Sequence, residues 1–216
     1  MRELFGHAPR RVLDIGCAAG AIGAGMKRSM PGLWVWGCEL NERAASVAAG
    51  RLDHVTTLPR EQWSAADRER VAGVDTVLLL DVLEHMYNPW AELQFLSANL
   101  PPDAQVIVSL PNVGYLWVIE ALSRGVFQYL PAGVLDVTHI RFFTLDTMRS
   151  MFEETGFEVE AIAVLGSSGE QMERFPAPVA CGKLLLTVES AEEWTQLNAT
   201  QFGFRLRPRR RGPHAV

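Results

Sequence analysis

The segment 12–20, Val-Leu-Asp-Ile-Gly-Cys-Ala-Ala-Gly, constrains the fold of this chain more than any other. Its apolar residues suit a strand that is buried on both faces, and Asp14 lies near the carboxyl end of that strand. Gly16 and Gly20 then allow a tight turn in which backbone amides can approach a ligand closely. The next apolar run ends at Glu39, about 20 residues after the turn, which is the spacing of a carboxylate that binds ribose hydroxyls. These features predict a nucleotide-type site at the end of a parallel sheet.

Strand-like and helix-like segments alternate along the chain, which predicts a mostly parallel sheet with helices on both faces. Two later segments, 184–188 and 202–206, are strand candidates, and we expect the second to be the final, antiparallel strand. The polar segment between them is compatible with a helix or a loop. The fold class is therefore α/β, with one Rossmann-like, doubly wound sheet. The expected strands are 11–15, 33–38, 54–57, 74–80, 105–110 and 158–165, and the expected helices are 21–30, 41–50, 60–70, 89–99 and 145–155.

The 216 residues, 48% of them hydrophobic and 21% charged, suit one globular domain, which we place at 1–206. A net charge of -5 gives no general attraction to nucleic acid or to an anionic membrane, so neither is an expected partner. Three scattered cysteines and the lack of a long apolar run or signal-like start indicate a cytoplasmic protein. The arginines of 205–211 favour a basic, disordered tail over 207–216.

The segment 111–143 follows the fifth expected strand without a regular pattern, apart from an amphipathic stretch at 116–122. A connection of about 30 residues is too long for an ordinary turn, so we expect a functional lid with some helix of its own. Aromatic residues within it either line a pocket for a second substrate or form the small core of the lid. They are Tyr115, Trp117, Phe127 and Tyr129.

Three further motifs follow the later strands or precede a helix. They are Asp81-Val-Leu-Glu84-His85, Ser109-Leu-Pro-Asn112 and Asp136-Val-Thr-His139-Ile-Arg141. The turn at 16–20 lacks the middle glycine of the dinucleotide fingerprint, which disfavours a pyrophosphate ligand. With these motifs, residues 11–165 resemble the class I S-adenosylmethionine-dependent methyltransferases, in particular the subgroup that methylates small molecules and sugar or glycan intermediates.

The resemblance implies a binding site for S-adenosylmethionine. Asp14 would lie near the methionine ammonium, the glycine turn against the amino acid and sugar portions, and Glu39 on both ribose hydroxyls, for which a carboxylate is suited. Leu40 would pack on the adenine, and the tip of the fourth strand would line the methionine side. The implied cofactor-binding residues are Asp14, Gly16, Cys17, Ala18, Gly20, Glu39, Leu40, Asp81, Val82 and Leu83.

Two departures from the family pattern concern the cofactor. Relatives carry an acidic residue for the adenine amine just after the third strand, but this chain has Leu58-Pro59 there, and Asp53 comes too early to replace it. Many relatives also have a cofactor-covering helix before the first strand, where this chain has ten residues. We therefore expect a reduced cofactor affinity, or cover from the lid or from a partner.

Methyl transfer from a sulfonium is an in-line displacement, so catalysis depends mainly on alignment and on the exclusion of water. A hydroxyl acceptor also loses a proton, and histidine is suited to take it at neutral pH. We expect His139 to be this base and Asp136 to orient its ring, and His85 completes the expected catalytic set. The alternative for Asp136, His139 and Arg141 is a structural hydrogen-bond network that anchors the lid.

Asp81, Glu84 and His85 also raise the alternative of a divalent cation that binds the acceptor oxygens. Relatives in the ubiquinone pathway and relatives acting on small RNA have similar spacing around a metal. Because the same Leu-Glu-His sequence occurs in many relatives that use none, we expect no metal here.

The expected function is methyl transfer to an oxygen, less readily a nitrogen, of a small molecule or sugar-containing acceptor. A homodimer or a partner subunit is compatible with the sequence. Two alternatives remain: a catalytically degenerate cofactor-binding or scaffolding subunit, and a nicotinamide-dependent oxidoreductase. The incomplete glycine turn disfavours the oxidoreductase, as does the presence of only two lysines, Lys27 and Lys183.

Overall fold

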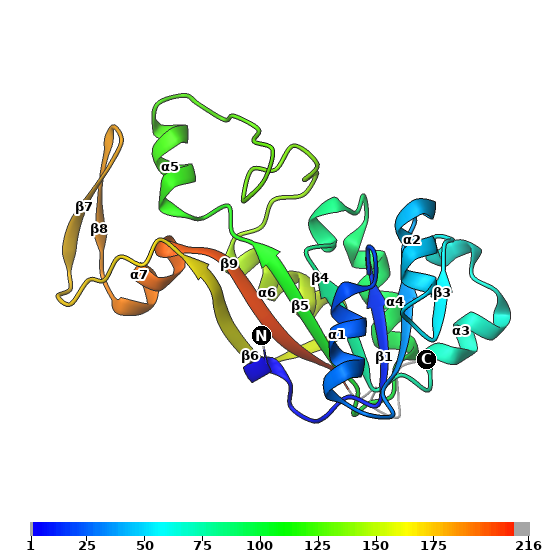
Figure 1. Cartoon of the computed structure of the whole chain (residues 1–216). Coiled ribbons are helices and arrows are strands. Elements are labelled where there is room, and N and C mark those ends of the chain that lie inside the picture. The colour runs from blue at the N-terminus through cyan, green and yellow to red at the C-terminus, as the bar shows by residue number, and fades with distance from the viewer. Residues whose placement is uncertain (1, 210–216) are drawn as a thin grey trace.

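The computed structural model describes residues 2–209, which form a seven-stranded sheet in the order β3-β2-β1-β4-β5-β9-β6 (Figure 1). Strands β1 to β5 pair in parallel, and β9 lies antiparallel between β5 and β6. The predicted fold class and the antiparallel last strand are therefore confirmed. The strands are β1 Arg11–Ile15, β2 Trp34–Cys38, β3 His54–Thr56, β4 Thr76–Leu80, β5 Gln105–Pro111, β6 Phe157–Ser167 and β9 Ala199–Pro208.

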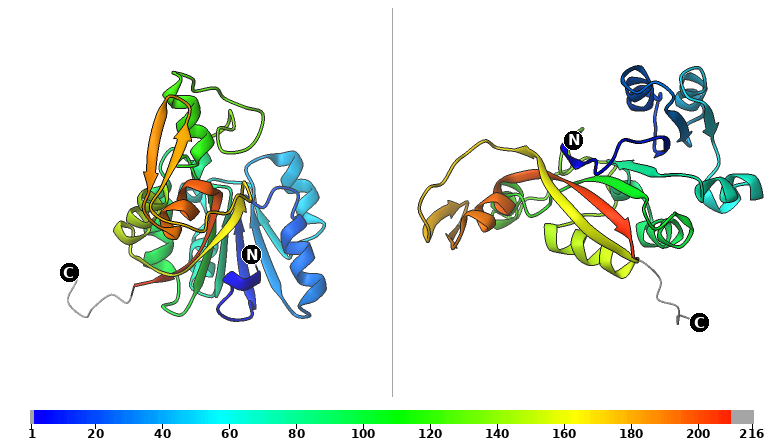
Figure 2. Two further views of the ribbon diagram at one scale, coloured as in Figure 1. Left: turned by 90° about the vertical axis from the view of Figure 1, so that its left-hand side faces the viewer. Right: turned by 90° about the horizontal axis from the view of Figure 1, so that it is seen from below.

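Helices cover both faces of the sheet (Figure 2). One face carries α1 (Ala21–Ser29), α2 (Glu42–Ala49) and the short 3₁₀ helix η1 (Arg2–Leu4). The other face carries α3 (Ala65–Val71), α4 (Pro89–Asn99) and α6 (Leu145–Glu154). No helix in the described part of the chain is long and apolar enough to span a membrane.

The expected helix over 60–70 was wrong in extent. The structure has a 3₁₀ turn, η2 (Arg60–Gln62), and then a separate α3 that begins after Ser64. The Ser64 hydroxyl accepts a hydrogen bond from the Asp67 backbone N–H, so Ser64 is an N-cap that starts a new helix.

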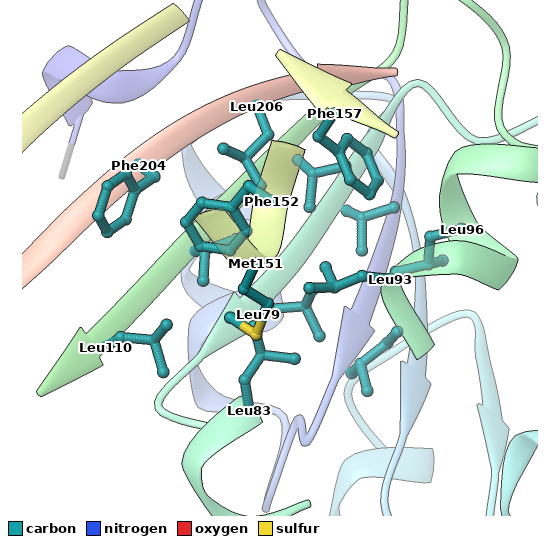
Figure 3. Packing of buried hydrophobic residues seen from close by; sticks show 14 of the residues in the cluster. Leu79, Leu83, Leu93, Leu96, Leu110, Met151, Phe152, Phe157, Phe204 and Leu206 are labelled. Atoms are coloured by element: carbon teal, nitrogen blue, oxygen red, sulfur yellow. The ribbon is translucent and has the colours of Figure 1, made fainter. Parts of the chain in front are cut away.

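The main hydrophobic core lies between the sheet and the helices α3, α4 and α6 (Figure 3). Phe152 of α6 packs against Phe204 of β9, with ring centroids 5.0 Å apart. Residues of β4 alternate between this core, which holds Leu79, and the opposite face, which holds Leu78. The central strands are thus buried on both faces, as their unbroken apolar sequence predicts.

Two insertions lie beyond the carboxyl end of the sheet. The first is the expected lid, 111–143, which contains α5 (Leu116–Ser123). The second, between β6 and β9, holds the hairpin of β7 (Ala177–Cys181) and β8 (Leu184–Val188), followed by α7 (Ala191–Asn198). Both strand candidates are therefore strands, and the polar segment between them contains a helix. The sequence did not predict β7, in which Pro178 interrupts the strand pattern.

The hairpin packs on the lid. The Ser123 hydroxyl at the end of α5 accepts from the Lys183 backbone N–H at 3.0 Å and lies 3.3 Å from the Cys181 carbonyl. The lid is thus held by a segment about 60 residues away in sequence, as Figure 1 shows for α5 and the hairpin.

The last strand extends further than expected. It runs to Pro208, and Arg205 and Arg207 form ion pairs with Glu160 and Glu158 of β6 at 3.1 and 2.9 Å. These two arginines belong to the sheet, so the expected start of the tail at residue 207 was wrong. The remainder of the expected tail, 210–216, lies outside the described residues.

Candidate functional site

The glycine turn after β1 has a backbone that few other residues could adopt. Gly16 and Gly20 have φ values of 73° and 72°, and Ala18, at 46°, is also in the left-handed region. Such a conformation costs a non-glycine residue about 1 kcal/mol or more, and it is found most often at functional sites. The Gly16 and Cys17 N–H groups donate to the Cys38 carbonyl, which ties the turn to the end of β2.

Gly16 also packs too closely for any side chain. A Cβ atom at this position would lie 2.6 Å from Cγ2 of Val82, the half-buried residue that follows Asp81. The backbone of the turn after β1 therefore packs directly against the Val82 side chain of the loop after β4. This contact brings Val82 to the position that the family resemblance implies for it.

Glu39 lies at the tip of β2 beside the turn. Its two carboxylate oxygens accept from the backbone N–H groups of Ala18, at 2.9 Å, and Asn41, at 2.7 Å. Each oxygen retains acceptor capacity, so the carboxylate is fixed in position and still able to bind two hydroxyls. Leu40 follows with 64% of its surface exposed, which leaves an apolar side chain free to cover a flat ligand group.

Asp14 is a buried carboxyl group without a complete set of partners. It is 3% exposed, and its Oδ2 has no hydrogen-bond partner among the described residues. Burial raises the pKa of Asp14 to about 7. A bound cation would supply the missing partner and favour the ionised form. The orphaned oxygen therefore fits the ammonium group that the resemblance implies.

Cys17 takes part in the turn through its backbone N–H, and its side chain is not a reactive thiolate. Burial raises the pKa of the Cys17 thiol to about 12, and the nearby charges of Asp14 and Glu39 add to the effect. The thiol is therefore neutral across the physiological pH range.

Asp81 closes the opposite side of the site. Its φ of 54° is again left-handed, and its backbone N–H donates to the Ser109 hydroxyl at 3.0 Å. The same hydroxyl donates to Asp81 Oδ1 at 2.8 Å, and Gln201 Nε2 donates to that oxygen as well. Asp81 thus lies at the expected edge of the sheet, held by two side chains from β5 and β9. Leu83, by contrast, is fully buried in the main core.

The sequence reasoning missed Ser109 and Gln201 as site residues. Ser109 belongs to a motif that was noted without a role. Gln201 lies 120 residues after Asp81, and only the antiparallel pairing of β9 with β5 brings the two together.

A cavity of about 330 Å³ adjoins Asp81. Its lining comes from the tips of β4 and β5, from the lid and from the start of β9. The strand ends therefore form its floor and the lid its cover, which is the arrangement expected for a second substrate. The lining residues are Asp81, Glu84, His85, Pro111, Gly133, Val134, Asp136, His139, Thr200 and Gln201.

Glu84 and His139 form the buried end of this cavity. Glu84 is fully buried, neither of its carboxyl oxygens has a hydrogen-bond partner within residues 2–209, and Oε1 lies 4.0 Å from His139 Nε2. Burial raises the pKa of Glu84 to about 8, and the charge of Asp81 adds to the rise. His139 Nδ1 lies 3.1 Å from the Val134 carbonyl, which assigns a proton to Nδ1 and leaves Nε2 as the basic nitrogen.

His85 lies beside His139 and supports its ring. The two imidazoles meet edge to face, with centroids 4.9 Å apart, and His85 Nδ1 lies 3.1 Å from the Thr138 carbonyl. The structure therefore brings the two expected catalytic histidines together.

The expected orienting role of Asp136 was wrong. Its carboxylate accepts from the Thr138 N–H and hydroxyl, at 2.8 and 2.6 Å, and makes no hydrogen bond to His139. These bonds lower the pKa of Asp136. A carboxylate so close to its own backbone forms a local turn, and the Val134 carbonyl orients the histidine in its place.

Three side chains could together hold a metal ion. Ligand atoms of Glu84, His85 and His139 all lie within 4.8 Å of one another. This set differs from the alternative that the sequence raised, Asp81, Glu84 and His85, because His139 joins it and the Asp81 carboxylate is bonded to Ser109 and Gln201. The unpartnered, buried Glu84 oxygens suit a cation.

Two of the lid aromatics pack within the lid. Phe127 contacts Tyr129 and Phe142, with ring centroids 5.6 and 5.5 Å apart, and neither Phe127 nor Tyr129 lines the cavity. Because Phe127 and Tyr129 remain 43% and 50% exposed, the rings form a surface cluster on the lid and not an enclosed core.

The residues directly after β3, 57–59, include no carboxylate, as the sequence indicated. Leu58 is 46% exposed there. Asp53 cannot substitute, because it accepts from the Val35 N–H and from Lys27 before the start of β3. Leu40 and Leu58, the apolar residues that follow β2 and β3, are both exposed.

Comparison with known proteins agrees with this geometry. The sequence model of a family described as a methyltransferase domain matches residues 2–162. The chain belongs to this methyltransferase family. The resemblance to class I S-adenosylmethionine-dependent methyltransferases is thereby confirmed, and S-adenosylmethionine is the cofactor of the class. This result excludes the alternative of a nicotinamide-dependent oxidoreductase.

Two of the curated proteins that the chain resembles have the same name. The chain is 31% identical over 137 residues to the ubiquinone biosynthesis O-methyltransferase of Dechloromonas aromatica, covering 60% of this chain and 57% of the relative. It is 28% identical over 144 residues to the protein of the same name from Marinobacter nauticus, covering 59% of each. The chain thus spans less than two thirds of the length of these relatives.

A solved structure supports the fold. The S-adenosylmethionine-dependent methyltransferase of Thermotoga maritima superposes with a TM-score of 0.60 at 17% identity, covering 95% of this chain and 84% of that one. The methyltransferase arrangement of the sheet is therefore shared, although the sequences have diverged.

Substitution of Gly16 tests the close contact in the methyltransferase turn. Gly16→Ala is expected to displace Val82 and to lower the affinity for S-adenosylhomocysteine by about tenfold or more, measured by calorimetry. Gly32→Ala is the matched control, because Gly32 also has a positive φ, 84°, but nothing lies within 4 Å of an added Cβ. Gly32→Ala should lower the free energy of unfolding by about 1 kcal/mol and leave the affinity for S-adenosylhomocysteine unchanged. Equal affinities of the two variants would contradict the proposed packing.

The pKa of Asp14 predicts a pH-dependent affinity. In the free protein, Asp14 is protonated below its pKa of about 7 and must lose that proton to pair with a ligand ammonium. The affinity for S-adenosylhomocysteine should therefore fall as the pH is lowered from 8 to 6, by up to about tenfold per pH unit below 7. In Asp14→Asn this part of the dependence should disappear and the affinity at pH 8 should be lower. An identical pH profile in the variant would rule out this role for Asp14.

Proposed function

We propose that the protein transfers the methyl group of S-adenosylmethionine to an oxygen of a small, hydroxyl-bearing acceptor bound under the lid. The observation that supports this most directly is the cavity of about 330 Å³ that adjoins Asp81 and contains His139 in its lining. The cofactor would bind at the edge of the sheet where the glycine turn, Glu39 and Asp81 lie. The acceptor would then lie on the far side of Asp81, next to the methyl group.

The relatives favour oxygen as the target. Both are named O-methyltransferases of ubiquinone biosynthesis, and O-methylation of a small molecule carries over to this chain as part of the proposal. A sugar-containing acceptor would present the same hydroxyl chemistry to the cavity, and nitrogen remains the less favoured target.

The catalytic contribution of the protein would come mainly from alignment. The sulfonium supplies the reactive methyl group, and the protein holds the acceptor oxygen in line with it while the lid excludes water. Asp81 is suited to fix the boundary between the two ligands, since Ser109 and Gln201 both hold its carboxylate.

His139 is the proposed proton acceptor. Its Nε2 carries the free lone pair and faces Glu84 at the end of the cavity, while the Val134 carbonyl fixes the ring through Nδ1. On taking the proton of the acceptor hydroxyl, the ring becomes a cation, which the ionised form of the Glu84 carboxyl, 4.0 Å away, would stabilise.

A divalent cation is the second candidate for hydroxyl activation, favoured by the unpartnered oxygens of Glu84. Glu84, His85 and His139 would hold the ion, and the ion would lower the pKa of an acceptor hydroxyl.

Substitution of His139 tests the proposed function. His139→Gln should lower the transfer of a labelled methyl group to a panel of hydroxylated small molecules by about 10²-fold or more. Its affinity for S-adenosylhomocysteine should stay within about twofold, because the ring lies on the acceptor side. Asp136→Asn is the matched control from the same loop, and it should retain most activity because the Asp136 carboxylate bonds to Thr138 and not to the His139 ring. Full turnover in His139→Gln would remove the base assignment, whereas cofactor binding without turnover on any acceptor would favour the scaffolding alternative.

Chelation distinguishes the two candidates for activation of the acceptor hydroxyl, His139 as a base and a bound divalent cation. If His139 acts as the base, EDTA should leave the turnover of the wild-type protein unchanged. If a cation activates the hydroxyl, EDTA should abolish turnover and added Mg²⁺ should restore it. Measurement of S-adenosylhomocysteine affinity in the same samples shows whether the fold survives the treatment.

A further inference from the structure

The β7–β8 hairpin has no part in the site described above. It lies at the end of the molecule opposite the β3 edge of the sheet, beyond α7 (Figures 1 and 2). Its two strands pair only with each other, and a two-stranded hairpin is marginally stable alone in water. The packing of the hairpin on α5 supplies part of its support.

The outer edge of β8 has unpaired backbone groups. Cys181 pairs with Leu184 across a two-residue turn, so the hydrogen-bonded pairs of the hairpin alternate from that position. This alternation directs the N–H and C=O groups of Leu185 and Thr187 away from β7. Among the described residues, no backbone or side-chain partner meets these groups.

The other strand edges are protected against pairing, but that of β8 is not. The edge strand β3 has only three residues, and the edge strand β6 has register shifts and carries Glu158 and Glu160. Pro178 interrupts the outer edge of β7. In contrast, β8 has no charge, proline or register shift, and Leu185 is 73% exposed. Such an edge is a template for another strand.

We propose that β8 pairs with β8 of a second copy of this chain, antiparallel and about a two-fold axis at Leu186. In this register Leu185 of one copy lies opposite Thr187 of the other, and the outward backbone groups of both residues find partners. The two hairpins then form one four-stranded sheet. A two-fold axis makes the pairing self-complementary, as in most homodimers.

The side chains and charges match in the same register. Leu186 meets its own counterpart, and Leu184, 47% exposed in the monomer, lies opposite Val188, which its own chain already buries. Lys183 and Glu189 lie three positions before and after Leu186, so each Lys183 comes beside Glu189 of the other copy. Both are exposed, and neither forms an ion pair among the described residues. This charge symmetry argues for a second copy over an unrelated strand.

Pairing at this edge would also stabilise the lid. A Cβ at Gly182 would lie 2.9 Å from the Glu120 carbonyl of α5, so the tip of the hairpin and the lid helix are in close contact. Support for the hairpin is therefore support for α5.

Light scattering of the full chain tests the pairing. We expect a concentration-dependent species of twice the 23.9 kDa chain mass. Thr187→Pro removes an outward N–H and leaves the bonds of the hairpin intact, and it should weaken dimerisation by about tenfold or more. Thr187→Val, which keeps the N–H and the branched shape, is the matched control. A monomer at every concentration, or equal dimerisation of the two variants, would overturn the proposal.

Charge reversal and cross-linking test the register. Lys183→Glu should weaken the dimer at low salt, and addition of Glu189→Lys should restore it. Leu186→Cys should form a disulfide-linked dimer on oxidation, because non-hydrogen-bonded pairs approach closely, whereas Leu185→Cys should not. The native thiols are buried and do not interfere. An unchanged thermal midpoint would show that the variants fold. Failure of the double reversal, or equal cross-linking at both positions, would overturn the register.

Discussion

The parallel pairing of β1 with β2 and β4 is the interaction on which the site depends. Ile15 is in register with Cys38 on one side and Leu79 on the other, so all three strands end at nearly the same height. This register brings Gly16, Glu39 and Asp81 to one edge of the sheet. The backbone bonds from the turn to the Cys38 carbonyl and the contact of Gly16 with Val82 then fix their relative positions. A slip of one residue in this register would separate the three positions and turn the strand side chains to the opposite face.

Two buried carboxyl groups show how the fold favours function over stability. Asp14 and Glu84 both lie at the carboxyl edge with oxygens that have no hydrogen-bond partner in the described part of the chain, and burial raises the pKa of each. An unpartnered buried polar group is unfavourable, and nothing else in the core requires a carboxyl at these positions. Glu84 lines the proposed acceptor cavity together with Asp81, and Asp14 belongs to β1 on the proposed cofactor side. A ligand that supplies a positive charge or a hydrogen-bond donor would give the buried oxygens the partner they lack.

The sequence predicted the parts of the fold that local pattern determines. The strands from β1 to β6 and most helices were found because their apolar runs and caps are local signals, as Asn88-Pro89 at the start of α4 illustrates. The glycine turn, Glu39 and Asp81 were found for the same reason. The break between η2 and α3 was missed, although Ser64 followed by Asp67 was a readable capping signal.

The remaining parts of the site depend on contacts between distant segments. Gln201 reaches Asp81 only through the pairing of β9 with β5, and the Val134 carbonyl orients His139 where the spacing had suggested Asp136. The hairpin that supports the lid comes from an insertion whose first strand contains Pro178. Spacing along the chain cannot reveal such contacts, because each is decided by the long-range register of the sheet or by the path of a loop.

Calorimetric titration of the protein with S-adenosylhomocysteine, in buffers of different ionisation enthalpy, tests the central claim most directly. A single saturable site is predicted, together with the release of a proton below pH 7 as Asp14 ionises against the ligand ammonium. The absence of saturable binding would contradict the assignment of this edge of the sheet as a cofactor site. Binding without proton release at pH 6 would contradict the role given to Asp14.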